Sequence, residues 1–104
     1  MKITQFTCIA LIAMVSTAAW SLPTQTVSIE GVQFHPSALT VHRGDRIVWT
    51  NKDPFPHTGT ADTKLFDSHS IAPGASWSYV AKQPDEYAYS CTLHPTIKGQ
   101  IIVK

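Results

Sequence analysis

The chain has 104 residues and a formal net charge of +1, with seven prolines, five glycines, two cysteines and two methionines. A chain of this length builds one small domain, and a near-zero charge without runs of like charge argues against nucleic acid or an anionic membrane as the partner. The sequence also contains no serine-centred elbow, glycine-rich phosphate loop or zinc-protease helix motif.

The first 21 residues have the pattern of a secretory signal peptide. Lys2 precedes an apolar run over 3–15, and the small residues at 16–19 are typical of a cleavage region. The run is too short to span a bilayer, so we expect cleavage and export to the periplasm or beyond, without stable membrane insertion. The predicted boundaries are a leader at 1–21 and a domain at 22–104, which keeps equal numbers of basic and acidic residues, one cysteine and no methionine.

In the domain, short β-branched and aromatic runs alternate with turn residues. Prolines and glycines recur along it and leave little room for helices. In chain order we expect strands at 27–29, 39–41, 46–50, 76–80, 87–91 and 100–103, and a loop with one short strand at 60–72. This pattern predicts an all-β fold, a Greek-key β-sandwich of seven or eight short strands. Aromatic residues are expected to fill its core: Phe34, Trp49, Trp77, Tyr87 and Tyr89.

Three residues of this domain are candidate metal ligands. Cys91 is its only cysteine, so it cannot form an internal disulfide, and a free thiol in an oxidising compartment indicates a chemical role. His94 follows after a two-residue gap, which lets a thiolate at a strand end and an imidazole on the next turn meet one ion. His57 lies in a proline-restricted segment after the Trp49 strand. Two imidazoles and one thiolate form the trigonal set that favours copper in electron-transfer sites. Gly99 is expected to let the chain re-enter the last strand.

An ordered series of segments resembles the small blue-copper proteins, the cupredoxins, and especially those of the amicyanin and plastocyanin type. The resemblance implies an exported monomeric sandwich that binds one copper ion and passes single electrons, as Cu(I)/Cu(II), between transient protein partners, without being an enzyme. It places His57, Cys91 and His94 on the three equatorial ligands. The segments that carry it are 34–36, 39–41, 44–53, 56–58, 66–68, 73–74 and 91–99.

The axial position departs from the family pattern. The related loop reads Cys-x-x-His-Pro-x-Met, and Ile97 stands in place of that methionine. A branched hydrocarbon cannot donate to a metal, so the resemblance implies a three-coordinate site with the Pro56 carbonyl oxygen as a distant contact. Loss of a neutral donor favours Cu(I), which predicts a higher reduction potential than in a methionine-containing relative.

The remaining histidines leave alternatives open. His69 could be an extra ligand or a second, weaker copper site, although a solvated loop residue is the simpler interpretation, as it is for His35 and His42. These three histidines support an alternative function, an exported copper buffer or delivery protein, against which the lack of methionine counts. A metal-free interaction domain, or a site that has drifted to another metal, are further alternatives.

Overall fold

The computed structural model describes residues 22–104, so the predicted leader at 1–21 lies outside the described residues. Across residues 22–104 the chain forms strands and turns without an α-helix, and accordingly no helix there is long and apolar enough to cross a membrane. The strands are β1 (Thr24–Ile29), β2 (Phe34–His35), β3 (Ala38–Val41), β4 (Arg46–Asn51), β5 (Thr60–Ala61), β6 (Ser76–Val80), β7 (Asp85–Cys91) and β8 (His94–Val103).

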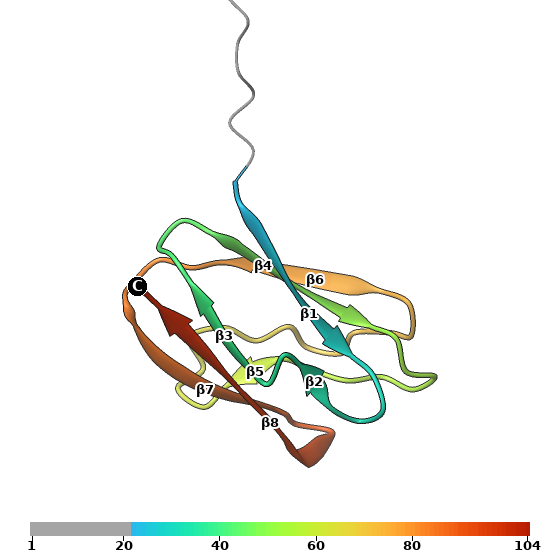
Figure 1. Cartoon of the computed structure of the whole chain (residues 1–104). Helices are drawn as coiled ribbons and strands as arrows, with labels where there is room; N and C mark the ends of the chain where they lie inside the picture. The colour runs from blue at the N-terminus through green and yellow to red at the C-terminus, as the bar shows by residue number, and fades with distance from the viewer. Residues whose placement is uncertain (1–21) are drawn as a thin grey trace, which may run out of the picture.

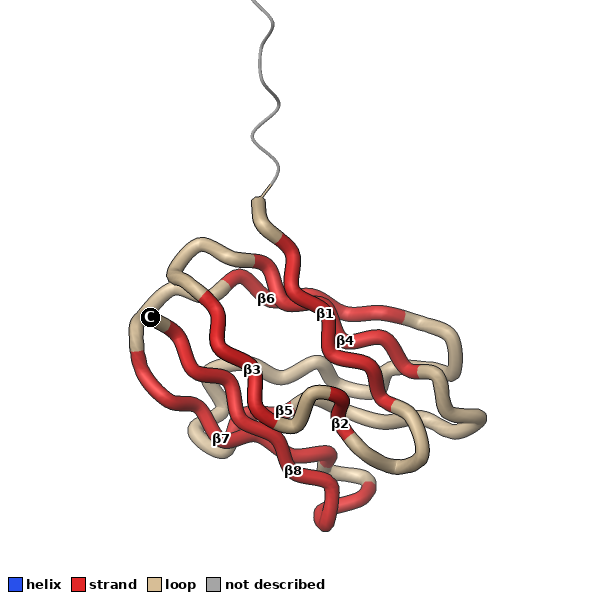
Figure 2. Tube along the Cα trace, in the orientation of Figure 1, coloured by secondary structure: helices blue, strands red, loops and turns tan. Residues whose placement is uncertain are grey.

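The strands form two four-stranded sheets that face each other (Figure 1, Figure 2). One sheet has the order β2-β1-β4-β6 and the other β3-β8-β7-β5. The pairs β1 with β4 and β3 with β8 are parallel, because the chain crosses between sheets, and the other pairs are antiparallel. The predicted all-β Greek-key sandwich is therefore confirmed.

The core lies between the sheets and is largely aromatic. Trp49 is fully buried, and its ring centroid lies 5.4 Å from that of Phe66 and 5.5 Å from those of Trp77 and Tyr89. Alternation along β4 causes this, since every second residue of a strand faces the opposite sheet. Phe34, Trp49 and Tyr89 are buried as expected, whereas Trp77 and Tyr87 are only partly buried.

The last strand differs from its prediction. β8 begins at His94 rather than at residue 100, and it forms a tight hairpin with β7. Its register shifts, because Cys91 pairs with His94 while Ser90 pairs with Lys98, so residues 95–97 form a bulge. The prediction placed His94 on a turn before the strand, whereas pairing with β7 carries β8 through Pro95, which lies in the bulge, where a proline is tolerated.

Gly99 also has a different role from the predicted one. It lies inside β8, opposite Tyr89, and not at a point where the chain re-enters the strand. A Cβ atom at this position would lie 2.6 Å from the Tyr89 hydroxyl oxygen. The glycine is therefore needed for close packing of the Tyr89 ring and not for turn geometry.

Candidate metal centre

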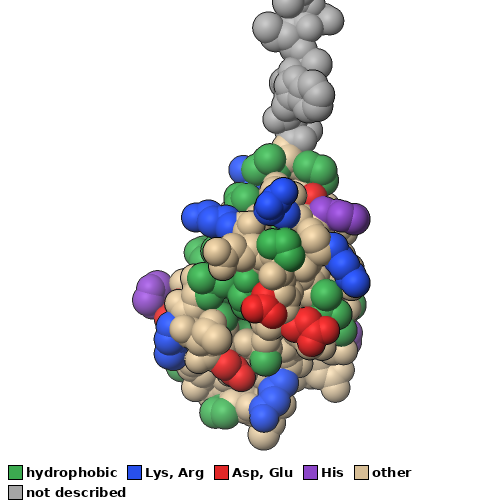
Figure 3. All heavy atoms as spheres, turned by 90° about the vertical axis from the view of Figure 1, so that its left-hand side faces the viewer, with side chains coloured by type: hydrophobic (Ala, Val, Ile, Leu, Met, Phe, Trp, Pro, Cys, Tyr) green, Lys and Arg blue, Asp and Glu red, His purple; other side chains and the backbone are tan. Residues whose placement is uncertain are grey.

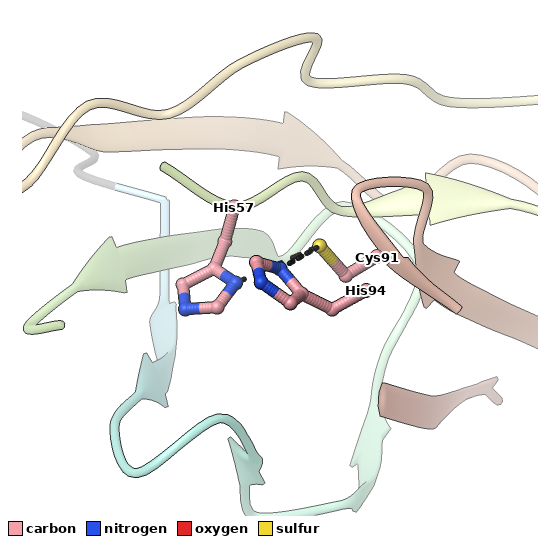
Figure 4. A group of neighbouring side chains, drawn as sticks. All are labelled: His57, Cys91 and His94. Atoms are coloured by element: carbon pink, nitrogen blue, oxygen red, sulfur yellow. Dashed lines mark hydrogen bonds between the residues drawn. The ribbon is translucent and has the colours of Figure 1, made fainter. Parts of the chain in front are cut away.

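The three predicted ligands converge at one end of the sandwich. His57 lies in the loop after β4, Cys91 ends β7 and His94 begins β8. Cys91 Sγ lies 3.6 Å from His57 Nδ1 and 3.9 Å from His94 Nδ1, and all three donor atoms lie within 4.8 Å of one another. Figure 4 shows both imidazole rings turned so that a nitrogen faces the sulfur.

These separations fit a single bound metal ion. Metal bonds of about 2.0–2.1 Å to imidazole nitrogen and about 2.3 Å to thiolate sulfur, at trigonal or tetrahedral angles, put the nitrogen and sulfur roughly 3.6–3.8 Å apart. The observed sulfur–nitrogen distances of 3.6 and 3.9 Å lie close to this range. Only small shifts are therefore needed to hold an ion between these donors.

The site is closed on one side and open on the other. His57 and Cys91 are fully buried, while His94 is only partly buried. The Phe55 ring lies 5.2 Å from the His57 ring and 5.6 Å from the His94 ring, and Phe55 is itself 37% exposed. Leu93, which precedes His94, is 52% exposed, so apolar side chains surround the accessible imidazole.

Asp53 holds the buried imidazole, a role that sequence reasoning missed. Its Oδ2 lies 2.7 Å from His57 Nε2, and its two oxygens accept hydrogen bonds from the backbone N–H groups of Gly31 and Val32. This contact puts the His57 proton on Nε2 and leaves the Nδ1 lone pair for a metal. Burial raises the pKa of Asp53, but the hydrogen bonds from Val32, His57 and Gly31 lower it by more in total. The four-residue spacing of Asp53 and His57 was the available signal.

Asn51 fixes the path of the chain that carries Asp53 and His57. Its side-chain Nδ2 donates to the Phe55 and Ile71 carbonyl oxygens, both at 2.9 Å, and its Oδ1 accepts the Asp53 N–H. Asn51 is fully buried, and each of these bonds satisfies a polar group that water does not reach. The loop is therefore ordered before any ion binds.

Thr58 joins the two ligand loops. Its backbone N–H donates to Cys91 Sγ at 3.3 Å, and its Oγ1 accepts the Thr92 N–H at 2.9 Å. A hydrogen bond to the sulfur of a metal thiolate reduces the electron density that the sulfur offers, which tunes the reduction potential. Thr58 and Thr92 lie 34 residues apart, so no local pattern could have revealed this contact.

The other histidines lie apart from the cluster. His35 and His42 are exposed, and the side chain of His69 is 86% exposed. His69 has a φ of 54°, its backbone N–H donates to Asp67 Oδ1, and its ring Nδ1 lies 3.8 Å from Asp67 Oδ2. Among residues 22–104 the metal-type cluster contains His57, Cys91 and His94 alone. The interpretation of His69 as a solvated loop residue agrees with this geometry.

Known proteins share the sequence pattern of this domain. A family model described as a cupredoxin-like domain matches residues 5–103. Amicyanin-alpha of Methylorubrum extorquens is 26% identical over 83 residues, covering 75% of this chain and 70% of that protein. Chloroplastic plastocyanin of Tetradesmus obliquus is 31% identical over 84 residues, covering 68% of this chain and 58% of that protein.

Solved structures share its fold. An amicyanin variant in its Cu(I) form superposes with a TM-score of 0.73 at 23% identity, covering 78% of this chain and 82% of that one. A copper-containing nitrite reductase from Thermus scotoductus SA-01 also has a TM-score of 0.73, at 27% identity, and here the match covers 80% of this chain but 22% of the enzyme. The family-model match spans nearly the whole chain, and the chain belongs to the cupredoxin-like family.

Proposed function

We propose that this protein is an exported one-copper electron carrier in which His57, Cys91 and His94 hold the metal. The observation that supports it best is the buried Cys91 sulfur lying 3.6 and 3.9 Å from two imidazole nitrogens. Copper bound there would supply reversible one-electron chemistry between Cu(I) and Cu(II). Membership of a family that includes amicyanin and plastocyanin relatives adds to this support.

The surrounding residues suit electron transfer better than catalysis. Asp53 and Asn51 hold His57 in place, and Thr58 holds Cys91, so the donors need to move little when the charge of the ion changes. His94 is the accessible ligand, and the exposed Phe55 and Leu93 beside it offer a small apolar surface. Brief encounters of redox proteins use small interfaces of this kind.

We further propose that the site lacks a methionine ligand. Ile97 lies in the bulge after His94 and is only 4% exposed, and residues 22–104 contain no methionine. A hydrocarbon in this position cannot donate to Cu(II), so Cu(I) is favoured. Replacing Ile97→Met should lower the reduction potential, with about 59 mV for each tenfold change in the preference for Cu(II) over Cu(I). A rise or no change would contradict the proposal.

The leader and the domain boundary belong to the same proposal. Cleavage near residue 21 leaves a domain at 22–104 whose first strand begins at Thr24. Expression of the full chain in a bacterium, followed by mass analysis of the periplasmic product, tests this. The expected product begins close to Leu22, and an unprocessed cytoplasmic product would contradict export.

The test of the whole function is the visible spectrum of the protein loaded with Cu(II), followed by a redox titration. Intense thiolate-to-copper charge transfer with reversible one-electron cycling is the expected result. A weak spectrum from histidine ligands alone, with more than one copper per chain, would instead indicate a copper buffer. Absence of copper binding would exclude both functions. Cys91→Ser is the matched variant, because it removes the thiolate and should abolish the intense band.

A further inference from the structure

A chain of hydrogen-bonded side chains leads away from the Cys91 loop. Thr92 Oγ1 lies 3.1 Å from Thr58 Oγ1, which lies 3.0 Å from Thr60 Oγ1, and Thr60 donates to Asp67 Oδ1 at 3.1 Å. Thr58 and Thr60 are 4% and 2% exposed, so water does not compete for their hydroxyl groups. The chain therefore connects the half-buried carboxylate of Asp67, which is not part of the metal cluster, to the neighbourhood of the sulfur.

Asp67 is ionised at neutral pH. The hydrogen bond from the His69 amide lowers the pKa of Asp67, burial offsets part of this effect, and the Thr60 hydroxyl and the electrostatic effects of His69 and Lys64 lower it further. These are the charged and polar groups that face the carboxylate. An ionised carboxylate can only accept hydrogen bonds, which fixes the direction of every bond that reaches it.

The direction of the bond to Asp67 also fixes the direction of the hydrogen bonds between the three threonines. Each hydroxyl has one proton to donate. Thr60 uses its proton on Asp67, so Thr60 Oγ1 accepts from Thr58, and Thr58, with its own proton used, accepts from the Thr92 hydroxyl and from the Thr92 N–H. Aligned hydrogen bonds of this kind polarise and strengthen one another. The charge of Asp67 therefore orders the protons of three hydroxyl groups.

Thr58 connects the chain to the surroundings of the Cys91 sulfur. Thr58 contributes both its Oγ1, which holds the peptide that follows Cys91, and its N–H, which donates to Sγ at 3.3 Å. Any reorientation of the Thr58 side chain thus alters the peptide that positions the sulfur and the hydrogen bond that the sulfur accepts. Both changes act on the electron density that a thiolate offers to a metal.

We propose that Asp67 is a positioning residue for the copper centre, which acts through Thr60 and Thr58 on the hydrogen bonds around Cys91 Sγ and so sets the reduction potential. The proposal rests on the proposed copper function. The chain holds Thr58 so that its N–H donates to Sγ, which draws electron density from the sulfur and favours Cu(I). Removing the charge or interrupting the chain weakens this hydrogen bond and should therefore lower the potential.

Two variants separate the effect of the Asp67 charge from the effect of the hydrogen-bonded threonine chain. In Asp67→Asn the side-chain oxygen can still accept from Thr60 and from the His69 amide, while the charge is lost. In Thr60→Val the charge stays, but the nearly isosteric valine cannot pass the hydrogen bond on. We expect a lower reduction potential and a shifted charge-transfer band in both, and recovery of both properties in Thr60→Ser. Asp62→Asn, an exposed carboxylate in the same segment without a place in the chain, is the matched control and should shift the potential less.

Two outcomes would overturn the proposal. An equal shift in Asp67→Asn and Asp62→Asn, with none in Thr60→Val, would mean that Asp67 acts as a charge through space. Loss of stability in Asp67→Asn and Thr60→Val at an unchanged potential would mean that the chain is only structural.

A measurement without copper distinguishes this proposal from the proposed function. Hydrogen exchange of the Thr58 and Thr92 amides in the metal-free protein should be several-fold faster in both variants, because both amides donate within the network. Unchanged exchange in both variants would overturn the role of Asp67 even if the protein binds copper. Faster exchange in a protein that fails to bind copper would instead refute the proposed function and retain the network.

Discussion

The two loops that carry the proposed ligands are held very differently. In the 51–58 loop, His57 is fully buried, and its Nε2 lies 2.7 Å from Asp53, which is itself held by two backbone amides. In the 91–97 loop, His94 is partly exposed, and among residues 22–104 its ring has a polar contact only with Cys91, at 3.9 Å. One loop therefore fixes the geometry of the site, and the other provides access to it.

This division suits a carrier of electrons. Donors held in place would keep the rearrangement of a bound copper ion small on oxidation and reduction, and the accessible His94 imidazole would give the electron a route to a partner. The end of the sandwich opposite to the site has a more mixed surface than the apolar surroundings of His94. Figure 3 shows that face, where hydrophobic side chains lie among charged ones of both signs. A mainly apolar pocket elsewhere in the domain is lined by Leu65, Tyr79, Lys82 and Gln83.

The largest effect is expected from removing each imidazole in turn. His57→Gly and His94→Gly should both lose the intense charge-transfer band, because each leaves a site with two donors. Added imidazole should restore the band in His94→Gly, where the space opens to solvent, and not in His57→Gly, where it is enclosed. Titration of both Cu(II)-loaded variants with imidazole, followed by visible absorption, measures this. Equal rescue would show that the two sides of the site are equally accessible.

The second-largest effect is expected on copper affinity, from loss of the contact between Asp53 and His57. In Asp53→Asn the new amide would place a donor against the N–H groups of Val32 and Gly31 or the His57 ring. Loss of such an outer partner of a metal-bound histidine costs about 10–100-fold in metal affinity. Competition with a copper chelator measures the affinity, and Asp62→Asn, an exposed carboxylate, is the control. An affinity equal to that of the control would show that Asp53 does not hold His57 for the metal.

A smaller effect on stability is expected inside β8, where Gly99 lies opposite Tyr89. Gly99→Ala would bring a Cβ atom to 2.6 Å from the Tyr89 hydroxyl, and overpacking of this kind costs about 1–3 kcal/mol in the free energy of unfolding. Gly59→Ala is the matched control, because its Cβ atom would lie no closer than 3.4 Å to Trp49. Urea unfolding of the metal-free variants measures both. Equal losses would show that the Tyr89 ring shifts freely to make room for the added carbon.

Sequence reasoning predicted most of the strands, though not β2, and proposed three candidate ligands, for a physical reason. Alternation of apolar residues follows directly from strand geometry, and the spacing of Cys91 and His94 places two donors on one hairpin. The start of β8 was missed because pairing between β7 and β8 outweighs the local preference of Pro95.

Apart from the Asp53–His57 pair, the contacts that hold the ligands could not be predicted because they join distant segments. Asp53 binds a turn that lies 22 residues away, and Thr58 contacts Thr92 across 34 residues. Such pairs are decided by the packing of the two sheets. The three candidate donors came from the spacing of Cys91 and His94 together with the resemblance to the cupredoxins, whereas most of the residues that orient them carried no such signal.

The smallest effect is expected in the pH dependence of the stability that Asp53 gives to the 51–58 loop. Asp53 has a folded-state pKa below the ordinary value of 3.8, because the hydrogen bonds from Val32, His57 and Gly31 outweigh the raising effect of burial. The unfolded chain therefore binds protons first as the pH falls. The stability from Asp53 is complete above the unfolded pKa and is lost as the pH drops through the lower folded value. The free energy of unfolding of the metal-free protein should thus fall more steeply below about pH 4 than that of Asp53→Asn. Parallel curves would show that the carboxylate gains nothing from its partners, and the rigid loop would then owe its order to Asn51 alone.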